Sequence, residues 1–508
     1  SFATLSATAN RGKYAGVKDL IPYLQKLGVN AVQLMPIHEY SVDSGNPEGY
    51  SWGYLPASFF APESSYSSNP ATGAAVSELK DLVKALHAAG IAVILDVVLT
   101  HTANYYNYLY FADPYNRSYF RLSGTSWANL GTGNWINDDK TVQPFVHKLV
   151  RDNLRYWVKD FHVDGFRFDL VVGTLKATLQ DVQNELCNPT AGTCVATMSD
   201  NQSTTIKPPN FWTGENWLGA TRHDWMVQSG TTSASYPSIS FSSNLNGDYV
   251  GFSQWNDYYR ESVKGFIQGK TDTTTTNRTR AAVYFSKSRD DGIWQAVSLN
   301  PVDTLNYLES HDEESVAHAV QNNVYKAAAG IFMLMTSHGI PMLYEGQEFM
   351  RNRQIQDQSK TGNNLDWQLA TTNADMLAFV GTLVKMRKAC PALRYASDPT
   401  NTFSNFDTTT PNQTISFFTR SGTSCSGFTG ADAGFINTKS EFRILANMTG
   451  AAQNFVVETG GTSWRAVAAV SGGNDNTNCS DQAAATLRWA NGTGTNLISG
   501  WGPTTNNW

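Results

Sequence analysis

An arginine and a carboxylate stand two positions apart in the apolar segment His162 to Leu170. Alternate side chains of a β-strand share a face, so Arg167 and Asp169 point to one side and their apolar neighbours to the other. A strand that buries an apolar face and directs a cation and an anion to the opposite face is typical of a polar site. For this segment taken alone, the alternative is a buried ion pair within a core.

Three further segments of strand-forming residues also end in acidic or histidine side chains. Parallel α/β barrels keep their active sites at the C-terminal ends of their strands. The four segments together therefore predict a single site. The three additional segments are residues 91–101, with Asp96 and His101, residues 211–217, with Glu215, and residues 305–312, with His311 and Asp312.

In chain order, these segments resemble the conserved regions of the α-amylase superfamily of glycoside hydrolases. The order is an Asp…His strand, a Gly-Phe-Arg-x-Asp strand, a Gly-Glu strand and a His-Asp pair. Three stretches look most similar to the pullulanase, isoamylase and glycogen-debranching branch of the superfamily. They are residues 50–54, 163–170 and 306–312.

The resemblance implies cleavage of α-glucans with retention of configuration by two carboxyl groups. Asp169 matches the nucleophile, Glu215 the general acid and base, and Asp312 the third carboxylate, which binds sugar hydroxyls. We expect the charge of Arg167 to keep Asp169 ionised. We expect Glu215 to lie in a drier setting that allows it to hold a proton.

The resemblance also implies a set of substrate-binding residues around these carboxylates. His101 and His311 are expected to donate hydrogen bonds to the sugar, and Tyr54 to stack under the ring that is cleaved. Asp96 either touches the substrate or supports Arg167. Core packing or a loop role is the alternative for the remaining candidates, which are Trp52, Trp217, Asp366 and Trp367.

Metal ligands are not indicated by the spacing of histidine and acidic residues. The residues around His311 and His318 match no zinc pattern, and we expect neither a metal nor a required cofactor. In many members of the superfamily, an asparagine at the position of Thr100 binds a structural calcium. This departure counts against that site, although an oxygen-rich loop elsewhere could still bind calcium.

Length and composition restrict the class of protein. The 508 residues suffice for one large barrel and a smaller domain. The net charge of −6 comes with no basic stripe, and no run of about 18 apolar residues is present, so we expect no nucleic acid partner and no membrane span. Aromatic residues form 12% of the chain and suit the stacking of sugar rings. We expect a monomer with an α-glucan as its partner.

The chain has five cysteines. Their spacing and the polar C-terminal segment favour a secreted protein with Cys187–Cys194 and Cys425–Cys479 disulfides and a free thiol at Cys390. The alternative is five free thiols in a cytosolic enzyme.

Helices and strands alternate as far as Tyr395, which predicts a (β/α)8 barrel over residues 1–395. Seven strands are visible, so we expect the first strand at or before the N-terminal residues 1–4 and a gene product that extends upstream. Short alternating runs over residues 396–508 predict an antiparallel β-sandwich. The expected strands are residues 31–37, 91–99, 163–170, 211–215, 251–255, 304–309 and 341–345, and the expected helices are 17–27, 77–89, 144–161, 257–267, 323–337 and 376–389.

The leading hypothesis is a hydrolase of starch, glycogen or pullulan-type polymers that prefers α-1,6 linkages. The same triad also serves α-1,4 hydrolysis or a transferase such as a branching enzyme. A glucan-binding relative without activity is the alternative of a different class. Leu55 counts against α-1,6 cleavage, because pullulanases usually carry aspartate there.

Overall fold

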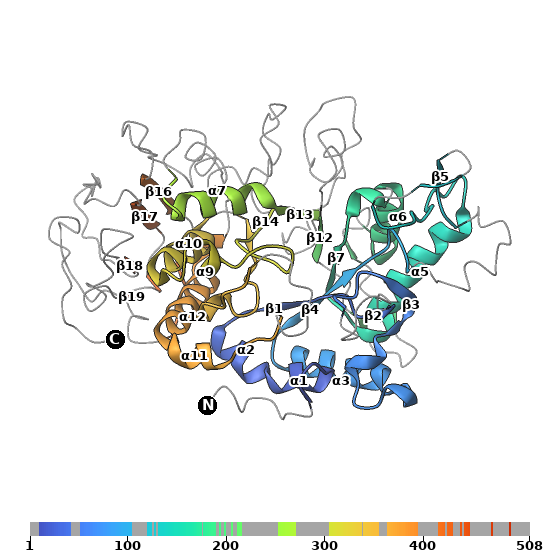
Figure 1. Ribbon diagram of the computed structural model, residues 1–508, viewed down its shortest axis with the longest axis horizontal. Helices are drawn as coiled ribbons and strands as arrows, with labels where there is room; N and C mark the ends of the chain where they lie inside the picture. The colour runs from blue at the N-terminus through green and yellow to red at the C-terminus, as the bar shows by residue number, and fades with distance from the viewer. Residues whose placement is uncertain are drawn as a thin grey trace. The chain divides into compact units, whose positions relative to one another are not determined.

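Figure 1 shows the helices and strands of the protein in a computed structural model. The chain divides into two compact units. The first consists mainly of residues 3–255, and the second mainly of residues 256–357 and 362–508. The structure describes residues 10–41, 51–103, 119–123, 126–128, 131–174, 176–188, 193–194, 198–199, 205–206, 211–215, 252–270, 304–337, 339–354, 363–394, 415–421, 424–429, 437–438, 441–447, 469–470 and 487–488.

The first unit contains five strands of a sheet in which spatial order follows chain order. Each pair of neighbouring strands in this set is parallel. Parallel neighbours need crossover connections, which the intervening helices supply for the earlier strands. Each strand coincides with a predicted one. They are β1 (Ala31–Leu34), β4 (Ala92–Val97), β7 (Gly165–Phe168), β12 (Phe211–Gly214) and β13 (Phe252–Asn256).

The helices of this unit follow local sequence signals. Helix α5 begins with Pro144, whose missing N–H is not needed in a first turn. One predicted helix, over residues 17–27, is divided in two, because Pro22 cannot donate a hydrogen bond inside a helix. The helices are α1 (Tyr14–Asp19), α2 (Ile21–Leu27), α3 (Ala74–Ala88), α5 (Pro144–Phe161) and α6 (Lys176–Leu186), with 3-10 turns η3 (Ser64–Tyr66), η4 (Pro70–Thr72) and η5 (Val171–Gly173).

An antiparallel pair, β2 (His38–Tyr40) and β3 (Pro56–Pro62), brings a histidine into the core. The His38 ring lies 5.9 Å from the Phe59 ring and 5.4 Å from the Trp157 ring, centroid to centroid. Among the described residues, neither nitrogen of His38 has a hydrogen-bond partner. Burial lowers the pKa of His38 to about 3, so the ring is neutral at ordinary pH.

Short antiparallel pairs complete the first unit. They are β5 (Leu122–Ser123) with β6 (Ser126–Trp127), β8 (Cys187–Asn188) with β9 (Thr193–Cys194), and β10 (Met198–Ser199) with β11 (Thr205–Ile206).

The second unit is mainly helical, with two short parallel strands, β14 (Thr304–Asn306) and β15 (Ile340–Pro341). Both strands are shorter than predicted. Helix α10 is buried around most of its surface, which suits its run of Ala, Ile and Met residues. The helices are α7 (Asp257–Ile267), α9 (Val316–Ala319), α10 (Val324–Thr336), α11 (Gln368–Thr372), α12 (Ala374–Ala389) and α13 (Pro391–Arg394), with the 3-10 turn η9 (Gln347–Phe349).

Two antiparallel pairs follow in the C-terminal segment. They are β16 (Ile415–Ser421) with β17 (Glu441–Asn447) and β18 (Ala469–Val470) with β19 (Leu487–Arg488). Antiparallel pairing agrees with the strands expected there. Apart from residues 424–429 and 437–438, the rest of the predicted sandwich lies outside the described residues, as does the predicted first barrel strand.

The disulfide prediction was wrong for two cysteines. Cys390, at the end of α12, is bonded to Cys425. Cys390 is therefore not a free thiol, and Cys425 does not pair with Cys479, which lies outside the described residues. Cys187 and Cys194 stand opposite each other in the β8–β9 register. Chain proximity suggested the wrong partner because residues 390 and 425 become neighbours only in the fold.

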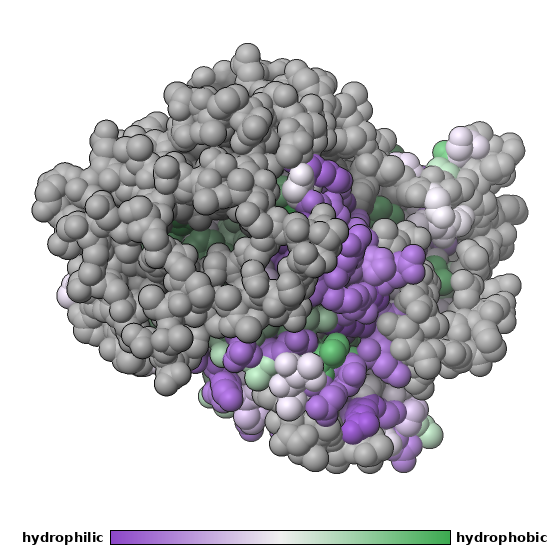
Figure 2. Space-filling model, turned by 60° about the vertical axis from the view of Figure 1, so that its left-hand side comes forward, coloured by the Kyte–Doolittle hydropathy of each residue, from purple (hydrophilic) through white to green (hydrophobic). Residues whose placement is uncertain are grey.

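No described helix is long and apolar enough to cross a membrane. On the face shown in Figure 2, the described surface is mainly hydrophilic. The large apolar side chains that the described part of the chain exposes are Val76, Leu122, Val142 and Phe145.

We predict that thiol labelling of denatured, unreduced protein leaves Cys390 and Cys425 unmodified, because they form one disulfide. Peptide mapping should recover them as a linked pair, and Cys390→Ser should make Cys425 reactive. Labelled Cys390 in the unaltered protein would contradict the assignment.

Candidate active site

A single guanidinium holds three carboxylates at the C-terminal edge of the first unit's sheet. Strands β4 and β7 are in register with Asp96 opposite Arg167. Arg167 Nη1 donates to Asp96 Oδ1 at 2.9 Å and to Asp169 Oδ1 at 3.0 Å. Nη2 donates to Glu215 Oε2 at 2.8 Å. Three of the four segments predicted to form one site thus supply, from three neighbouring strands, one connected group of charges.

The strand ends place these carboxylates by continuing the backbone ladder. Asp169 N donates to Val97 O at 3.0 Å, and Glu215 N donates to Phe168 O at 3.1 Å. Parallel strands end at a common edge, so residues just beyond β7 and β12 meet. The side-chain positions therefore follow from regular strand geometry, as the sequence predicted for Arg167 and Asp169.

Two backbone features fit this edge. A Cβ on Gly165 would lie 2.3 Å from the carbonyl oxygen of Phe211, so only glycine allows β7 to approach β12 so closely. Leu170, directly after Asp169, has a φ of 41°, in the left-handed region that a branched side chain rarely adopts. This turn brings Leu170 N to 3.4 Å from Glu215 Oε2. Strained backbone of this kind is often found at functional sites.

The charges are almost completely removed from water. Arg167 is 0% exposed, Asp96 1%, Glu215 5% and Asp169 8%. Burial alone disfavours the charge of Arg167, but the surrounding carboxylates outweigh it and raise the pKa of the guanidinium well above its usual value. Three carboxylates around one cation make the site negative. Glu215 occupies the dry setting that the sequence predicted, although one of its oxygens faces Arg167.

Aromatic rings enclose the guanidinium. The Arg167 Cζ lies 4.6 Å from the Trp255 ring centroid and 5.6 Å from that of Tyr54. Tyr54 Oη donates to Asp96 Oδ2 at 2.8 Å, and burial is the main cause that raises the pKa of Tyr54 well above 10. Asp96 therefore binds two side chains of the site, which is the supporting role considered in the sequence. Sequence reasoning missed Trp255, whose only signal was its position at the end of a weakly predicted strand.

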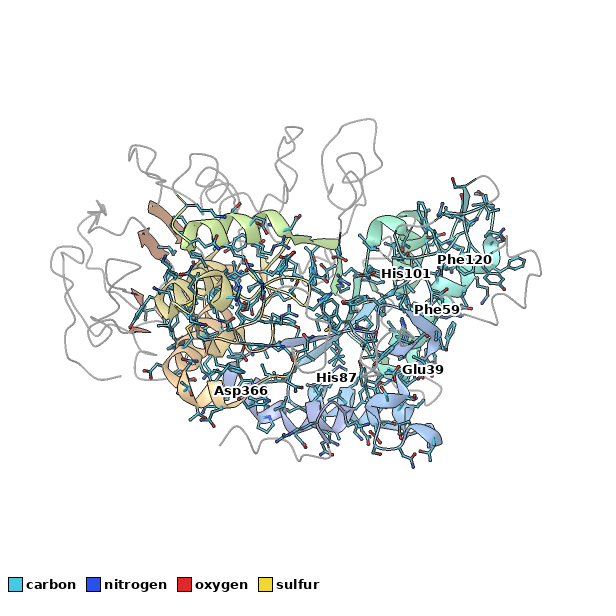
Figure 3. The ribbon with its side chains drawn as sticks, in the orientation of Figure 1. Glu39, Phe59, His87, His101, Phe120 and Asp366 are labelled. Carbon is cyan, nitrogen blue, oxygen red and sulfur yellow. A yellow bond between two sulfur atoms is a disulfide. The ribbon has the colours of Figure 1, made fainter. Side chains whose placement is uncertain are left out.

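His101, labelled in Figure 3, follows β4 and makes its hydrogen bonds within the protein. Its Nε2 lies 2.8 Å from the Tyr54 carbonyl oxygen and its Nδ1 lies 2.9 Å from Thr100 Oγ1. The Nε2–H must donate to the carbonyl, so Nδ1 accepts from the threonine hydroxyl. Burial lowers the pKa of His101. These contacts connect His101 to the segment at Tyr54, and its role as a donor to sugar stays a prediction.

The second unit carries the third predicted carboxylate. The His311 Nε2 lies 3.0 Å from Asp312 Oδ2, and His311 is buried while Asp312 is partly exposed. Both residues belong to a loop, residues 310–315, that follows β14. Buried Glu309, directly before this loop, accepts a hydrogen bond from Val316 N, and burial raises the pKa of Glu309 to about 7.

The other predicted binding residues are scattered over the two units. Trp52 is buried in the first unit, and its role stays a prediction. In the second unit, exposed Asp366 accepts from Gln368 N at 2.9 Å, and the Trp367 ring lies 5.5 Å from that of Phe349. Trp217 lies outside the described residues.

Among the described residues, no three His, Cys, Asp or Glu side chains are grouped so that they could hold a metal ion. Thr100 is buried, and its Oγ1 lies 2.9 Å from His101 Nδ1.

A model of one protein family matches most of the chain. The family model described as "Alpha amylase, catalytic domain" matches residues 1–129 and 133–449. A pullulanase of Bacillus subtilis (strain 168) is 30% identical over 431 residues, which are 77% of this chain and 55% of that protein. An isoamylase of Flavobacterium sp is 28% identical over 456 residues, covering 79% of this chain and 55% of the isoamylase. The chain thus spans about half the length of these curated relatives.

A solved structure has the same fold. The pullulanase of Paenibacillus barengoltzii, crystallised in complex with maltohexaose and α-cyclodextrin, superposes with a TM-score of 0.69 at 24% identity. The match covers 90% of this chain and 70% of that one. The α/β fold with parallel strands is therefore shared with a pullulanase.

We predict that Arg167→Met lowers the free energy of unfolding by about 3 to 5 kcal/mol, because it leaves buried carboxylates without their cation. Urea denaturation at pH 7 measures the loss. Arg151→Met is the control, because the Arg151–Glu185 pair is partly exposed and should cost about 1 kcal/mol or less. Equal losses in the two variants would contradict the central role of Arg167.

Proposed function

Because this chain belongs to the α-amylase catalytic-domain family, we propose that it is a retaining α-glucan hydrolase that cleaves α-1,6 branch linkages. One observation carries the proposal. Asp169 and Glu215 bind the two terminal nitrogens of one guanidinium. This arrangement favours the short carboxyl separation of about 5 to 5.5 Å that retaining enzymes use, over the longer one of inverting enzymes.

The proposed reaction has two displacements. Asp169 attacks the anomeric carbon while Glu215 gives a proton to the glycosidic oxygen, so the bond to the leaving sugar breaks and a glycosyl ester forms. Glu215 then takes a proton from water, and the water oxygen displaces Asp169 with a second inversion. Neither step requires a cofactor. The excess of negative charge around Arg167 stabilises the oxocarbenium-like transition states.

The remaining residues bind and orient the sugar in this proposal. Asp312 and His311 contact the hydroxyls of the sugar that is cleaved. Tyr54 presents an apolar ring for stacking, and its hydroxyl is fixed by Asp96. Asp96 and His101 act through Tyr54 and Arg167, because their hydrogen bonds go to those residues. Trp52, Trp217, Asp366 and Trp367 are proposed as more distant contacts.

The preference for α-1,6 linkages rests on the relatives. Proteins named pullulanase and isoamylase align with more than three quarters of this chain. A solved pullulanase that shares the fold holds malto-oligosaccharide. Hydrolysis of α-1,4 linkages or transfer between glucans with the same triad is the second candidate, and Leu55 favours it.

We further propose that the parallel strands close into a (β/α)8 barrel within residues 1–395, with a β-sandwich over residues 396–508. The chain order of neighbouring strands in the first unit supports the barrel, because singly wound sheets close in this way. The Cys390–Cys425 bond supports a secreted protein, since disulfides persist in oxidising compartments. The proposed enzyme acts as a monomer.

We predict that Asp169→Asn and Glu215→Gln each lower kcat by about 10³-fold or more on the best polymer substrate, because each removes half of the two-carboxyl mechanism. Initial rates of reducing-sugar release measure the loss. Asp181→Asn, which removes a carboxylate paired with Lys140 on the surface, should leave kcat unchanged. Turnover near the unaltered rate in either site variant would exclude these roles.

The linkage preference makes a separate prediction. Incubation with pullulan should release maltotriose, with little cleavage of linear amylose, because only the former contains α-1,6 bonds between maltotriose units. Chromatography of the products decides the question. Panose or short maltodextrins as main products would show that the enzyme cleaves α-1,4 linkages, and the proposed two-carboxyl mechanism would still apply.

A further inference from the structure

The loop that carries Asp312 is bound by one buried arginine. Arg353 Nη2 donates to the carbonyl oxygens of Ser310 at 2.7 Å, His311 at 2.6 Å and Glu313 at 2.8 Å. These three carbonyls surround Asp312 in the chain. Arg353 is 5% exposed, so the contacts are made in a dry setting where charge-assisted hydrogen bonds are strong.

The backbone of Arg353 also holds the end of this loop. Ser315 N donates to Arg353 O at 3.0 Å, and Arg353 N donates to Ser315 Oγ at 2.8 Å. Ser315 Oγ in turn caps α9 by accepting from His318 N. Residues 310–315 are therefore fixed to the segment around Arg353 along their whole length.

The same guanidinium reaches a second loop. Arg353 Nη1 donates to Asn363 Oδ1 at 3.1 Å, and Arg351 Nη2 donates to Asn363 O at 2.8 Å. Asn363 begins the segment that leads to Asp366 and Trp367. One buried cation thus links the Asp312 loop with the segment that carries two of the proposed substrate contacts, Asp366 and Trp367.

We infer that Arg353 is the positioning residue for Asp312, and that Asn363 orients Arg353 for this task. The inference rests on the proposed function, in which Asp312 binds the sugar at the cleaved bond. Arg353 itself need not touch substrate. Its planar fork satisfies carbonyls and an amide oxygen in several directions, whereas a lysine ammonium is a compact charge that cannot reach all of them.

A displacement of Asp312 is expected to change kcat more than KM. A group that is displaced by about 1 Å loses more of its interaction with the transition state than with bound substrate, and such displacements can cost about 10²-fold in rate. Arg353→Lys should therefore lower kcat by about 10- to 100-fold while KM changes by less than about threefold.

Arg387 offers a matched control in the same unit. It is 6% exposed, and its guanidinium donates to three backbone carbonyls, those of Met335, Ser337 and Gly339. The segment with these three carbonyls, residues 335–339, carries none of the proposed site residues. Arg387→Lys should lower the melting temperature about as much as Arg353→Lys, and leave kcat unchanged.

Asn363 supplies a milder pair of variants. Asn363→Ala removes the side-chain acceptor of Arg353 and keeps the backbone carbonyl that Arg351 uses, so kcat should fall severalfold. Asn363→Asp keeps an acceptor at the same place and should restore most of the rate. If Asn363 had only a structural role, kcat would fall in step with the melting temperature, and Asn363→Asp would not restore kcat.

The test compares kcat, KM and thermal unfolding of the full chain and the four variants on pullulan and on amylose. Backbone amide hydrogen exchange of residues 310–316 is measured by mass spectrometry for the same proteins. It should be faster only in the Arg353→Lys and Asn363→Ala variants. If the unaltered protein cleaves neither polymer, the proposed function fails, and exchange alone then decides whether Arg353 fixes the loop. Equal kcat losses in Arg353→Lys and Arg387→Lys, or unchanged exchange in Arg353→Lys, would overturn the inference.

Discussion

The structure depends on a full positive charge that is buried at the end of β7. An isolated guanidinium in such a place would be prohibitively unstable, so carboxylates from neighbouring strands must surround it. In the proposed mechanism, two of these carboxylates, Asp169 and Glu215, carry out the cleavage, and both are bound to the one cation. The need to neutralise Arg167 and the need to place Asp169 beside Glu215 are therefore met by one set of contacts.

Two arginines serve the proposed site in different ways. Arg167 binds side-chain carboxylates directly and so influences both their position and their charge. Arg353 binds backbone carbonyls on both sides of Asp312, so it fixes the path of the chain there. Arg167 therefore affects both the position and the charge state of the carboxylates it binds, whereas Arg353 affects the position of the backbone. In the proposed mechanism, the reacting carboxylates need the former and a hydroxyl-binding carboxylate needs only the latter.

Much of this could be read from the sequence, because regular periodicity determines where side chains point. The spacing of Arg167 and Asp169 placed both on one face, and strand order placed Glu215 beside them. Contacts that involve backbone atoms, or residues far apart in the chain, leave no recognisable pattern in the sequence. The carbonyl partners of Arg353 carry no residue signature, and Cys390 meets Cys425 only after folding. Pro22 did carry a signal, and its missing N–H explains the divided helix.

The buried ring of His38 has a consequence for the acid range of the protein. The unfolded chain takes up a proton at this residue below a pH of about 6.5, whereas the folded chain resists it until about pH 3. Between these values, acidification favours the unfolded state by about 1.4 kcal/mol for each pH unit. Phe59 and Trp157 offer no acceptor for the extra proton. The acid limit of this fold is thus set in part by a core imidazole that takes no part in the proposed chemistry.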